Sequence, residues 1–264
     1  MPLISVTLDL AYQTLGSGPA LLVLHGLFGS SANWRSIARQ LAATRTVYCV
    51  DMRNHGASPW ASSMSYVEMA DDVLQLMDRL DLQRAAVLGH SMGGKAAMAL
   101  ALRYPQRLEQ LVVVDIAPVS YVDVLSPVAQ AMLSVNLPQA SGRSDVERRL
   151  AQLLPDVSIV PFLMQNLVTR NEHFDWRLNL AAIYASMPNL CGFTDELKSL
   201  RSTCPLAVIA GELSPYVAQR DGSSFRPMFS QVSVDVIANA GHWVHADQPA
   251  AFISRLKQVL RASD

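Results

Sequence analysis

The chain is short of charge. Asp, Glu, Lys and Arg make up only 16% of its 264 residues, and acidic and basic side chains nearly balance at a formal net charge of -1. Attraction to a phosphate backbone or an anionic membrane surface requires clustered Lys and Arg side chains. Because the sequence has no such basic excess, it predicts no nucleic-acid partner.

Long apolar runs are missing as well. Half of the residues are hydrophobic, yet no run approaches the ~20 residues that a membrane-spanning helix needs. Residues 1–5 lack the basic segment and apolar stretch of an export signal. We therefore expect a cytoplasmic protein without stable membrane insertion, whose oligomeric state the sequence does not reveal.

Cysteine is scarce too. Cys49, Cys191 and Cys204 are odd in number and far apart, which excludes a complete disulfide framework and is unlike the spacing of a zinc site. Three reduced thiols are expected, with no metal and no cofactor.

Short β-type runs alternate with helical stretches, which is typical of an α/β protein with a mostly parallel central sheet flanked by helices. The turn composition of residues 15–19 predicts that the first two strands form an antiparallel edge. The predicted strands are residues 3–10, 20–24, 46–50, 85–88, 108–114, 206–210 and 232–237. The predicted helices are residues 33–43, 66–80, 95–104 and 249–261.

The alternation stops at residues 118–191, where helical pieces are separated by prolines. This predicts an inserted helical cap on a core made of residues 1–117 and 192–264. Several apolar and amide side chains there either line a lipophilic pocket or attach the cap to the core. They are Phe162, Leu163, Met164, Gln165, Asn166, Phe174, Trp176, Tyr184 and Met187.

The strongest motif is Gly89-His90-Ser91-Met92-Gly93, which lies between a predicted strand and a predicted helix. A sharp strand-to-helix turn crowds its neighbours, so glycines two residues before and after Ser91 relieve clashes and expose its hydroxyl. Ser91 is the predicted nucleophile of an α/β-hydrolase fold. His90 is expected to be structural.

The same turn points the backbone N–H of Met92 at the place where an oxyanion would form. A second donor is expected in the loop after the strand 20–24, with the Leu27 N–H as the candidate. His25, in that loop, is expected to shape it by hydrogen bonding. Together with Trp243, Leu27 and Met92 are the predicted substrate contacts.

This fold orders its triad as serine, acid, histidine, so the base must come late in the chain. His242 fits, in a loop between the last strand and the last helix, with His245 as its competitor. The usual acid position holds Ser214, which cannot stabilise an imidazolium as a carboxylate does. Asp115, at the end of the strand 108–114, is the leading substitute, and Glu212 is the alternative.

The segment 51–58 also places an acid, a base and a hydroxyl close together. We interpret it as a rigid loop bordering the pocket. In this interpretation Arg53 pairs with carboxylates or carbonyls, and Gly56 permits a tight turn.

Nearly the whole chain resembles the α/β-hydrolase superfamily. Five segments resemble the bacterial YbfF-type acyl esterases in particular: residues 51–56, 89–95, 114–118, 214–216 and 241–245. The resemblance implies hydrolysis of acyl esters, including fatty acyl-CoA thioesters. It also implies a triad of Ser91, Asp115 and His242, with Ser214 as an auxiliary hydrogen-bonding partner.

The expected function is therefore hydrolysis of a small-molecule acyl ester or thioester through an acyl-enzyme on Ser91. Two alternatives stay open: a carbon–carbon bond hydrolase on the same fold, which would keep the serine, and a non-catalytic ligand-binding relative.

Overall fold

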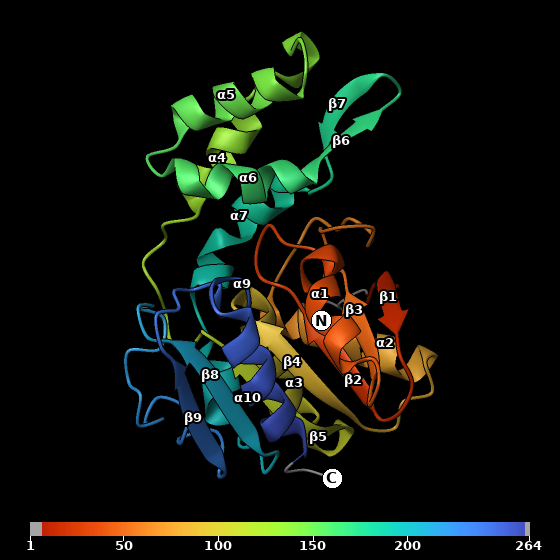
Figure 1. Cartoon of the computed structure of the whole chain (residues 1–264), viewed down its shortest axis with the longest axis vertical. Helices are drawn as coiled ribbons and strands as arrows, with labels where there is room; N and C mark the ends of the chain where they lie inside the picture. The colour runs from red at the N-terminus through yellow and green to blue at the C-terminus, as the bar shows by residue number, and fades with distance from the viewer. Residues whose placement is uncertain (1–6, 262–264) are drawn as a thin grey trace, which may run out of the picture.

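A seven-stranded sheet forms the centre of the molecule, in the order β1-β3-β2-β4-β5-β8-β9. The computed structural model (Figure 1) describes residues 7–261. Every neighbouring pair is parallel except β1 with β3. The strands are β1 (Tyr12–Leu15), β2 (Ala20–Leu24), β3 (Thr46–Val50), β4 (Ala85–His90), β5 (Leu108–Val114), β8 (Leu206–Gly211) and β9 (Val232–Ile237).

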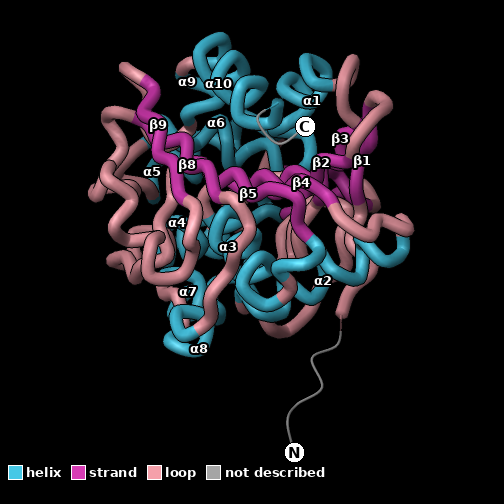
Figure 2. Tube along the Cα trace, turned by 90° about the horizontal axis from the view of Figure 1, so that it is seen from below, coloured by secondary structure: helices cyan, strands magenta, loops and turns pink. Residues whose placement is uncertain are grey.

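Helices cover both faces of this sheet, as Figure 2 shows. One face carries α1 (Arg35–Leu41) and α10 (Pro249–Arg261), and the other carries α2 (Tyr66–Arg79) and α3 (Met92–Arg103). With both of its faces covered, β4 is buried along its whole length, which explains its continuous apolar sequence. Two further short helices are α8 (Asp195–Ser199) and α9 (Val244–Asp247).

The prediction for the N-terminal edge was wrong. Residues 7–10 form no strand, residues 3–6 lie outside the described part, and the edge strand is instead β1. This strand is antiparallel as expected, but its partner is β3, which lies between β1 and β2. The four residues between β1 and β2 are enough to cross one strand, because neighbouring strands are only ~4.8 Å apart. The six other strand predictions are confirmed to within two residues.

Between β5 and α8 the chain leaves the sheet and forms a second layer of structure over its carboxyl edge (Figure 1). This part contains four helices: α4 (Ser126–Ser134), α5 (Arg143–Leu153), α6 (Val160–Leu163) and α7 (Leu180–Cys191). It also contains an unpredicted hairpin of β6 (Leu167–Arg170) and β7 (His173–Trp176). We call residues 118–191 the cap segment, and its separation from a core of residues 1–117 and 192–264 stays a prediction.

Lys95 holds both connections of the cap segment. Its Nζ donates to the carbonyls of Val119 at 2.8 Å, Cys191 at 3.1 Å and Gly192 at 2.7 Å. The ammonium also lies 4.7 Å from the centre of the Tyr121 ring, a favourable cation–π distance. Burial lowers the pKa of Lys95 to about 8. One side chain of the helix after Ser91 therefore fixes where the cap segment begins and ends.

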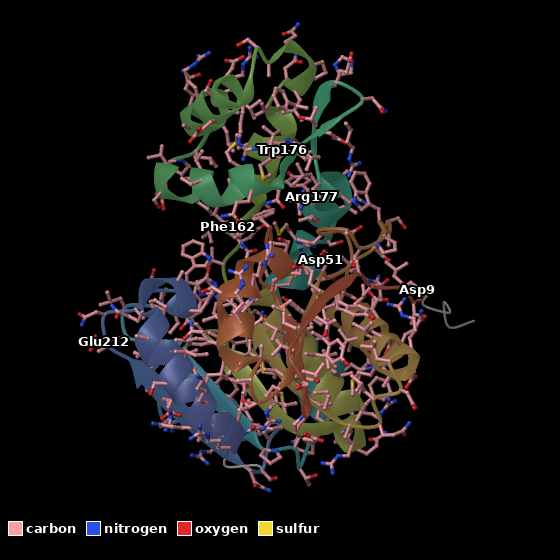
Figure 3. All side chains as sticks on the ribbon, turned by 45° about the vertical axis from the view of Figure 1, so that its right-hand side comes forward. Asp9, Asp51, Phe162, Trp176, Arg177 and Glu212 are labelled. Carbon is pink, nitrogen blue, oxygen red and sulfur yellow. The ribbon has the colours of Figure 1, made fainter. Side chains whose placement is uncertain are left out.

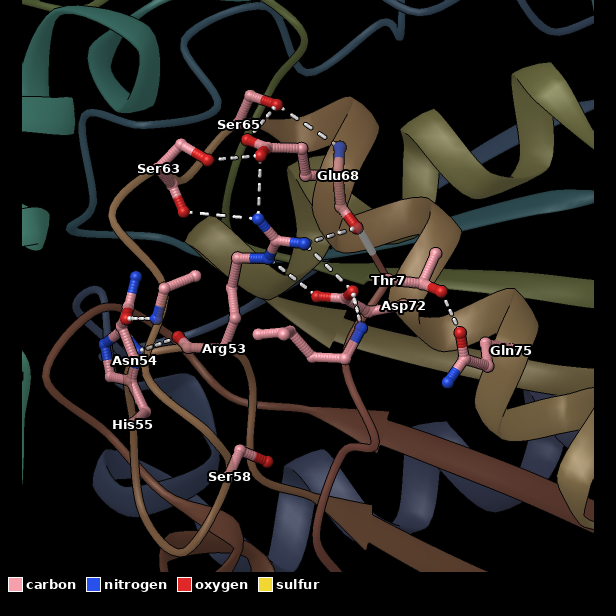
Figure 4. A network of polar contacts seen from close by, with 12 residues as sticks. Thr7, Arg53, Asn54, His55, Ser58, Ser63, Ser65, Glu68, Asp72 and Gln75 are labelled. Carbon is pink, nitrogen blue, oxygen red and sulfur yellow. Dashed lines mark hydrogen bonds and ion pairs between the residues drawn. The ribbon is translucent and has the colours of Figure 1, made fainter. Parts of the chain in front are cut away.

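A buried ion pair fixes the loop after β3, as predicted for Arg53 (Figure 4). The Arg53 guanidinium is 1% exposed; its Nε and Nη2 donate to Asp72 at 2.7 and 2.9 Å, and its Nη1 lies 2.9 Å from Glu68. Gly56 is required in the same loop, because a Cβ there would lie 2.1 Å from the Asp51 carboxyl carbon. Both predicted roles are confirmed.

Four buried or half-buried histidines connect the loops at the carboxyl edge. His25 accepts from the Met52 N–H at 3.0 Å and bonds the Gly26 carbonyl at 2.8 Å, so it shapes its loop as expected. His55 accepts from the Phe28 N–H at 3.2 Å, and the ring of His245 stacks on that of Trp34 with centroids 4.2 Å apart. Burial is the largest cause of a lowered pKa in all four histidines. It lowers the pKa of His25 and of His90, lowers that of His55 to about 3, and lowers that of His245 to about 4.

Replacing Arg53 by Met should lower the free energy of unfolding by about 3–5 kcal/mol, because it leaves the buried Asp72 carboxylate without its counter-charge. The matched control is Arg79→Met, which breaks a largely exposed pair with Asp9 and should cost no more than ~1 kcal/mol. Urea unfolding followed by circular dichroism measures both. Equal losses in the two variants would contradict this ranking.

Three buried histidines, His25, His55 and His90, and the half-buried His245 predict acid sensitivity. Each is neutral in the fold but takes up a proton in the unfolded chain below its ordinary pKa of 6.5. Their stabilisation is therefore complete above that pH and is lost as the pH falls, by up to ~1.4 kcal/mol per histidine and pH unit. His245→Phe keeps an aromatic ring on Trp34 and should reduce the slope between pH 6 and 5 by about a quarter. If the free energy of unfolding fell equally steeply with pH in the wild type and in His245→Phe, the assignment would be refuted.

Candidate active site

Ser91 stands at the sharp turn from β4 into α3, with φ 53° and ψ -121°. The turn needs its glycines. A Cβ on Gly89 would lie 2.2 Å from the Gly93 carbonyl oxygen, and one on Gly93 would lie 2.5 Å from the Leu24 carbonyl oxygen. The glycine spacing found in the sequence is thus a steric requirement of this backbone.

Asp115 follows the last residue of β5 and is fully buried. Its Oδ1 accepts from the Gly211 N–H at 3.0 Å, and its Oδ2 accepts from the hydroxyl of Ser214 and from the His242 Nδ1 at 2.8 Å. The structure therefore brings Asp115, Ser214 and His242 together. The three donors satisfy both oxygens of this buried carboxylate.

His242 lies between β9 and α9, and its ring contacts two others. The Tyr216 ring lies 4.2 Å away at 31°, and the His90 ring lies 4.7 Å away on centroids. His90 Nε2 also bonds the carbonyl of His242 at 2.9 Å. His90 is therefore a structural support, as predicted, and fixes the orientation of the imidazole whose Nδ1 faces Asp115.

Neither competitor occupies that position. Glu212 is exposed on the molecular surface (Figure 3), where its carboxylate accepts from the Asn239 N–H at 2.9 Å. His245 is stacked on Trp34, and burial keeps its pKa near 4. The carboxylate that contacts His242 belongs to Asp115.

Two backbone N–H groups near Ser91 have no acceptor among residues 7–261. The Met92 N–H opens α3, where the first N–H groups of a helix lack intrahelical partners. The Leu27 N–H is also unbonded, whereas its neighbours are engaged: Phe28 donates to His55, and Gly29 to Gly26. These are the two donors predicted for an oxyanion.

A cavity of about 370 Å³ opens above the turn, and Ser91, His242, Leu27 and Trp243 line it. In the described residues neither the Ser91 hydroxyl nor the His242 Nε2 has a hydrogen-bond partner, so both are available to a bound molecule. The walls are mostly apolar, and those from the cap segment include Val128, Leu154, Ile159 and Phe162.

Most of the nine cap-segment residues singled out from the sequence either line a cavity or pack in the cap segment, but Tyr184 is exposed and lines neither cavity. Phe162 lines this cavity and projects from the cap segment toward the core (Figure 3), and Met187 lines a smaller one. Leu163, Met164 and Trp176 are buried in packing, and Asn166 donates to the Phe28 carbonyl at 2.8 Å. The loop 51–58 provides none of the residues found along the larger cavity, so its expected place at the pocket border was wrong.

Sequence reasoning assigned no role to Tyr216 or Tyr121. The Tyr121 hydroxyl accepts from the Ala117 N–H at 2.8 Å and donates to the Tyr216 carbonyl at 2.6 Å, which anchors the tyrosine that packs on His242. In the sequence, Tyr216 could have been noticed only from its position two residues after Ser214. Tyr121 gives no such signal, because no spacing links it to Tyr216.

No metal site emerges from the described residues, in which no three His, Cys, Asp or Glu side chains are grouped so as to hold an ion. Within residues 7–261, no helix is long and apolar enough to cross a bilayer.

Comparison with known proteins agrees with this geometry. The family profile of the alpha/beta hydrolase fold matches residues 19–249. The sn-1-specific diacylglycerol lipase ABHD11 of Xenopus tropicalis is 36% identical over 93% of this chain and 79% of that relative. Esterase YbfF of Escherichia coli is 34% identical over 94% of this chain and 95% of its own length. A solved marine microorganism esterase superposes with a TM-score of 0.89 at 32% identity, covering 96% of this chain and all of the esterase.

These relatives act on ester bonds, and they match this chain along almost its whole length. The protein is accordingly a serine hydrolase of ester bonds. With its sheet, its serine turn and these relatives, the chain belongs to the α/β-hydrolase family.

Proposed function

We propose that the protein is a carboxylesterase in which Ser91 is the nucleophile, His242 the general base and Asp115 the triad acid. One observation carries the proposal: the buried Asp115 carboxylate bonds Nδ1 of His242 at 2.8 Å, and His242 lines the same cavity as Ser91. A carboxylate on Nδ1 holds the imidazole with its free Nε2 toward the nucleophile and stabilises the imidazolium that forms.

In the first half-reaction, Nε2 of His242 takes the Ser91 hydroxyl proton while Oγ bonds the ester carbonyl carbon. The negative charge that develops on the carbonyl oxygen is stabilised by the Met92 and Leu27 N–H groups. The imidazolium then protonates the alcohol oxygen as the carbon–oxygen bond breaks, leaving an acyl-enzyme. Water, deprotonated by His242, releases the acid and regenerates Ser91.

Ser214 has an auxiliary role in this proposal. Its hydroxyl donates to the Asp115 oxygen that also contacts His242 and accepts from the Tyr216 N–H at 3.3 Å. A hydrogen bond from a neutral donor satisfies one acceptor of a buried carboxylate, so Ser214 holds Asp115 in place.

Oxygen esters with an apolar portion fit the cavity best, because its walls are mostly hydrocarbon. The names of the relatives, a diacylglycerol lipase and an esterase, also favour oxygen esters. The serine chemistry extends to acyl-CoA thioesters, whose carbonyl meets the same nucleophile and the same two N–H donors. Direct comparison of matched oxygen esters and thioesters decides between the two substrate classes.

Asp115→Asn should lower kcat by ~10⁴, the size of the loss when a triad carboxylate becomes an amide. Ser214→Ala removes one hydrogen bond to that carboxylate and should lower kcat by about tenfold. Glu212→Gln, at the exposed alternative, should leave kcat within about twofold. Steady-state hydrolysis of p-nitrophenyl butyrate measures all three, with circular dichroism as the control for folding. A crippled Glu212→Gln beside a nearly unchanged Asp115→Asn would assign the acid to Glu212.

An organophosphonate should form a stable adduct on Ser91, detected by mass spectrometry of the intact protein and its peptides, and Ser91→Ala should abolish both the adduct and turnover. Turnover of a vinylogous diketone with no turnover of esters would identify a carbon–carbon bond hydrolase. A single burst of p-nitrophenol without turnover would identify a non-catalytic relative.

A further inference from the structure

Ser91 lies between two cavities of different size. Beside the larger cavity of about 370 Å³ there is a second one of about 50 Å³, and Ser91 and Leu27 line both. Met92 lines only the smaller cavity, whereas His242 lines only the larger. The two halves of an ester attached to Ser91 can therefore extend in two distinct directions.

The position of His242 decides which half goes where. The general acid must protonate the departing alcohol oxygen, so the alcohol leaves on the side of its Nε2. That side is the larger cavity. The acyl chain then extends the other way, past the Met92 and Leu27 N–H groups and into the smaller cavity.

We propose that the smaller cavity is the acyl site and restricts the substrate to esters of short acids of about two to four carbons, with the alcohol in the larger cavity. This inference rests on the proposed esterase function. One water molecule needs roughly 10–15 Å³ of such space, so 50 Å³ holds about three or four carbon atoms.

Several side chains that line the smaller cavity are held in place. The Tyr66 hydroxyl donates to the Leu190 carbonyl at 2.6 Å, and Lys95 is bonded to the three carbonyls at the cap connections. Met187 and Leu190, from α7, complete the wall and are buried. A longer acyl chain would have to displace these hydrogen-bonded side chains.

Three polar side chains that line the smaller cavity are already hydrogen-bonded. Lys95 uses its three N–H donors on the carbonyls of Val119, Cys191 and Gly192. The Tyr66 and Tyr121 hydroxyls donate to the carbonyls of Leu190 and Tyr216. These bonds hold the three polar side chains of the smaller cavity in fixed positions beside the acyl chain.

The test is hydrolysis of p-nitrophenyl esters with unbranched acyl chains of two to ten carbons by the wild-type chain. We expect kcat/KM to be highest at two to four carbons and to fall at least tenfold by six carbons. Preference for eight or ten carbons, with esters still hydrolysed, would overturn the acyl-site assignment alone. Absence of any ester hydrolysis would overturn the proposed function as well.

Two enlarging variants locate the acyl site. Met187→Ala and Leu190→Ala, made separately, should each move the acyl chain length with the highest kcat/KM to six or eight carbons. A shift in either variant is sufficient, provided that circular dichroism shows the variant to be folded. The matched control is Leu154→Ala in the larger cavity, which should keep the short-chain optimum while changing the relative rates for naphthyl and ethyl butyrate. A shift of the acyl optimum in Leu154→Ala, with none in the α7 variants, would assign the acyl chain to the larger cavity.

Discussion

The hydrogen bonds to the Asp115 carboxylate hold the catalytic edge together. They come from three places in the chain: the end of β8 through Gly211, the following loop through Ser214, and the loop after β9 through His242. Because the carboxylate is completely buried, each donor also offsets the cost of removing that charge from water. The orientation of His242 thus depends on packing between three neighbouring strands.

The chain has few charged residues, yet several of them are buried. Arg53 with Asp72, Lys95 with three carbonyls, and Asp115 with three donors are all almost fully buried, and each joins segments far apart in the sequence. Such groups are costly unless every donor and acceptor is satisfied. They fix the loop after β3, the base of the cap segment and the catalytic edge in single arrangements, around cavities that are otherwise lined by hydrocarbon.

The features that the sequence predicted are the ones that local sterics and periodicity determine. The turn at Ser91 needs glycines because of contacts within a few residues, and β4 is apolar because both of its faces are covered. The choice between Asp115 and Glu212 was harder, since it depends on which carboxylate reaches His242 across the sheet. Within the cap segment, Phe162 and Leu163 look equivalent in sequence, and only the packing of α6 turns one to the cavity and buries the other. The edge strand was misplaced because a short connection that crosses a strand has the same composition as a hairpin turn.

The three bonds of Lys95 close the cap segment into a loop at its base. Loop closure becomes only slowly less favourable as a loop lengthens, by about 0.6 kcal/mol for each doubling. Insertions or deletions between the two pinned connections therefore alter the roof of the cavities while the helix that carries Ser91 stays where it is. The fold in this way separates the part that selects a substrate from the part that cleaves it, so the first can diverge in evolution without disturbing the second.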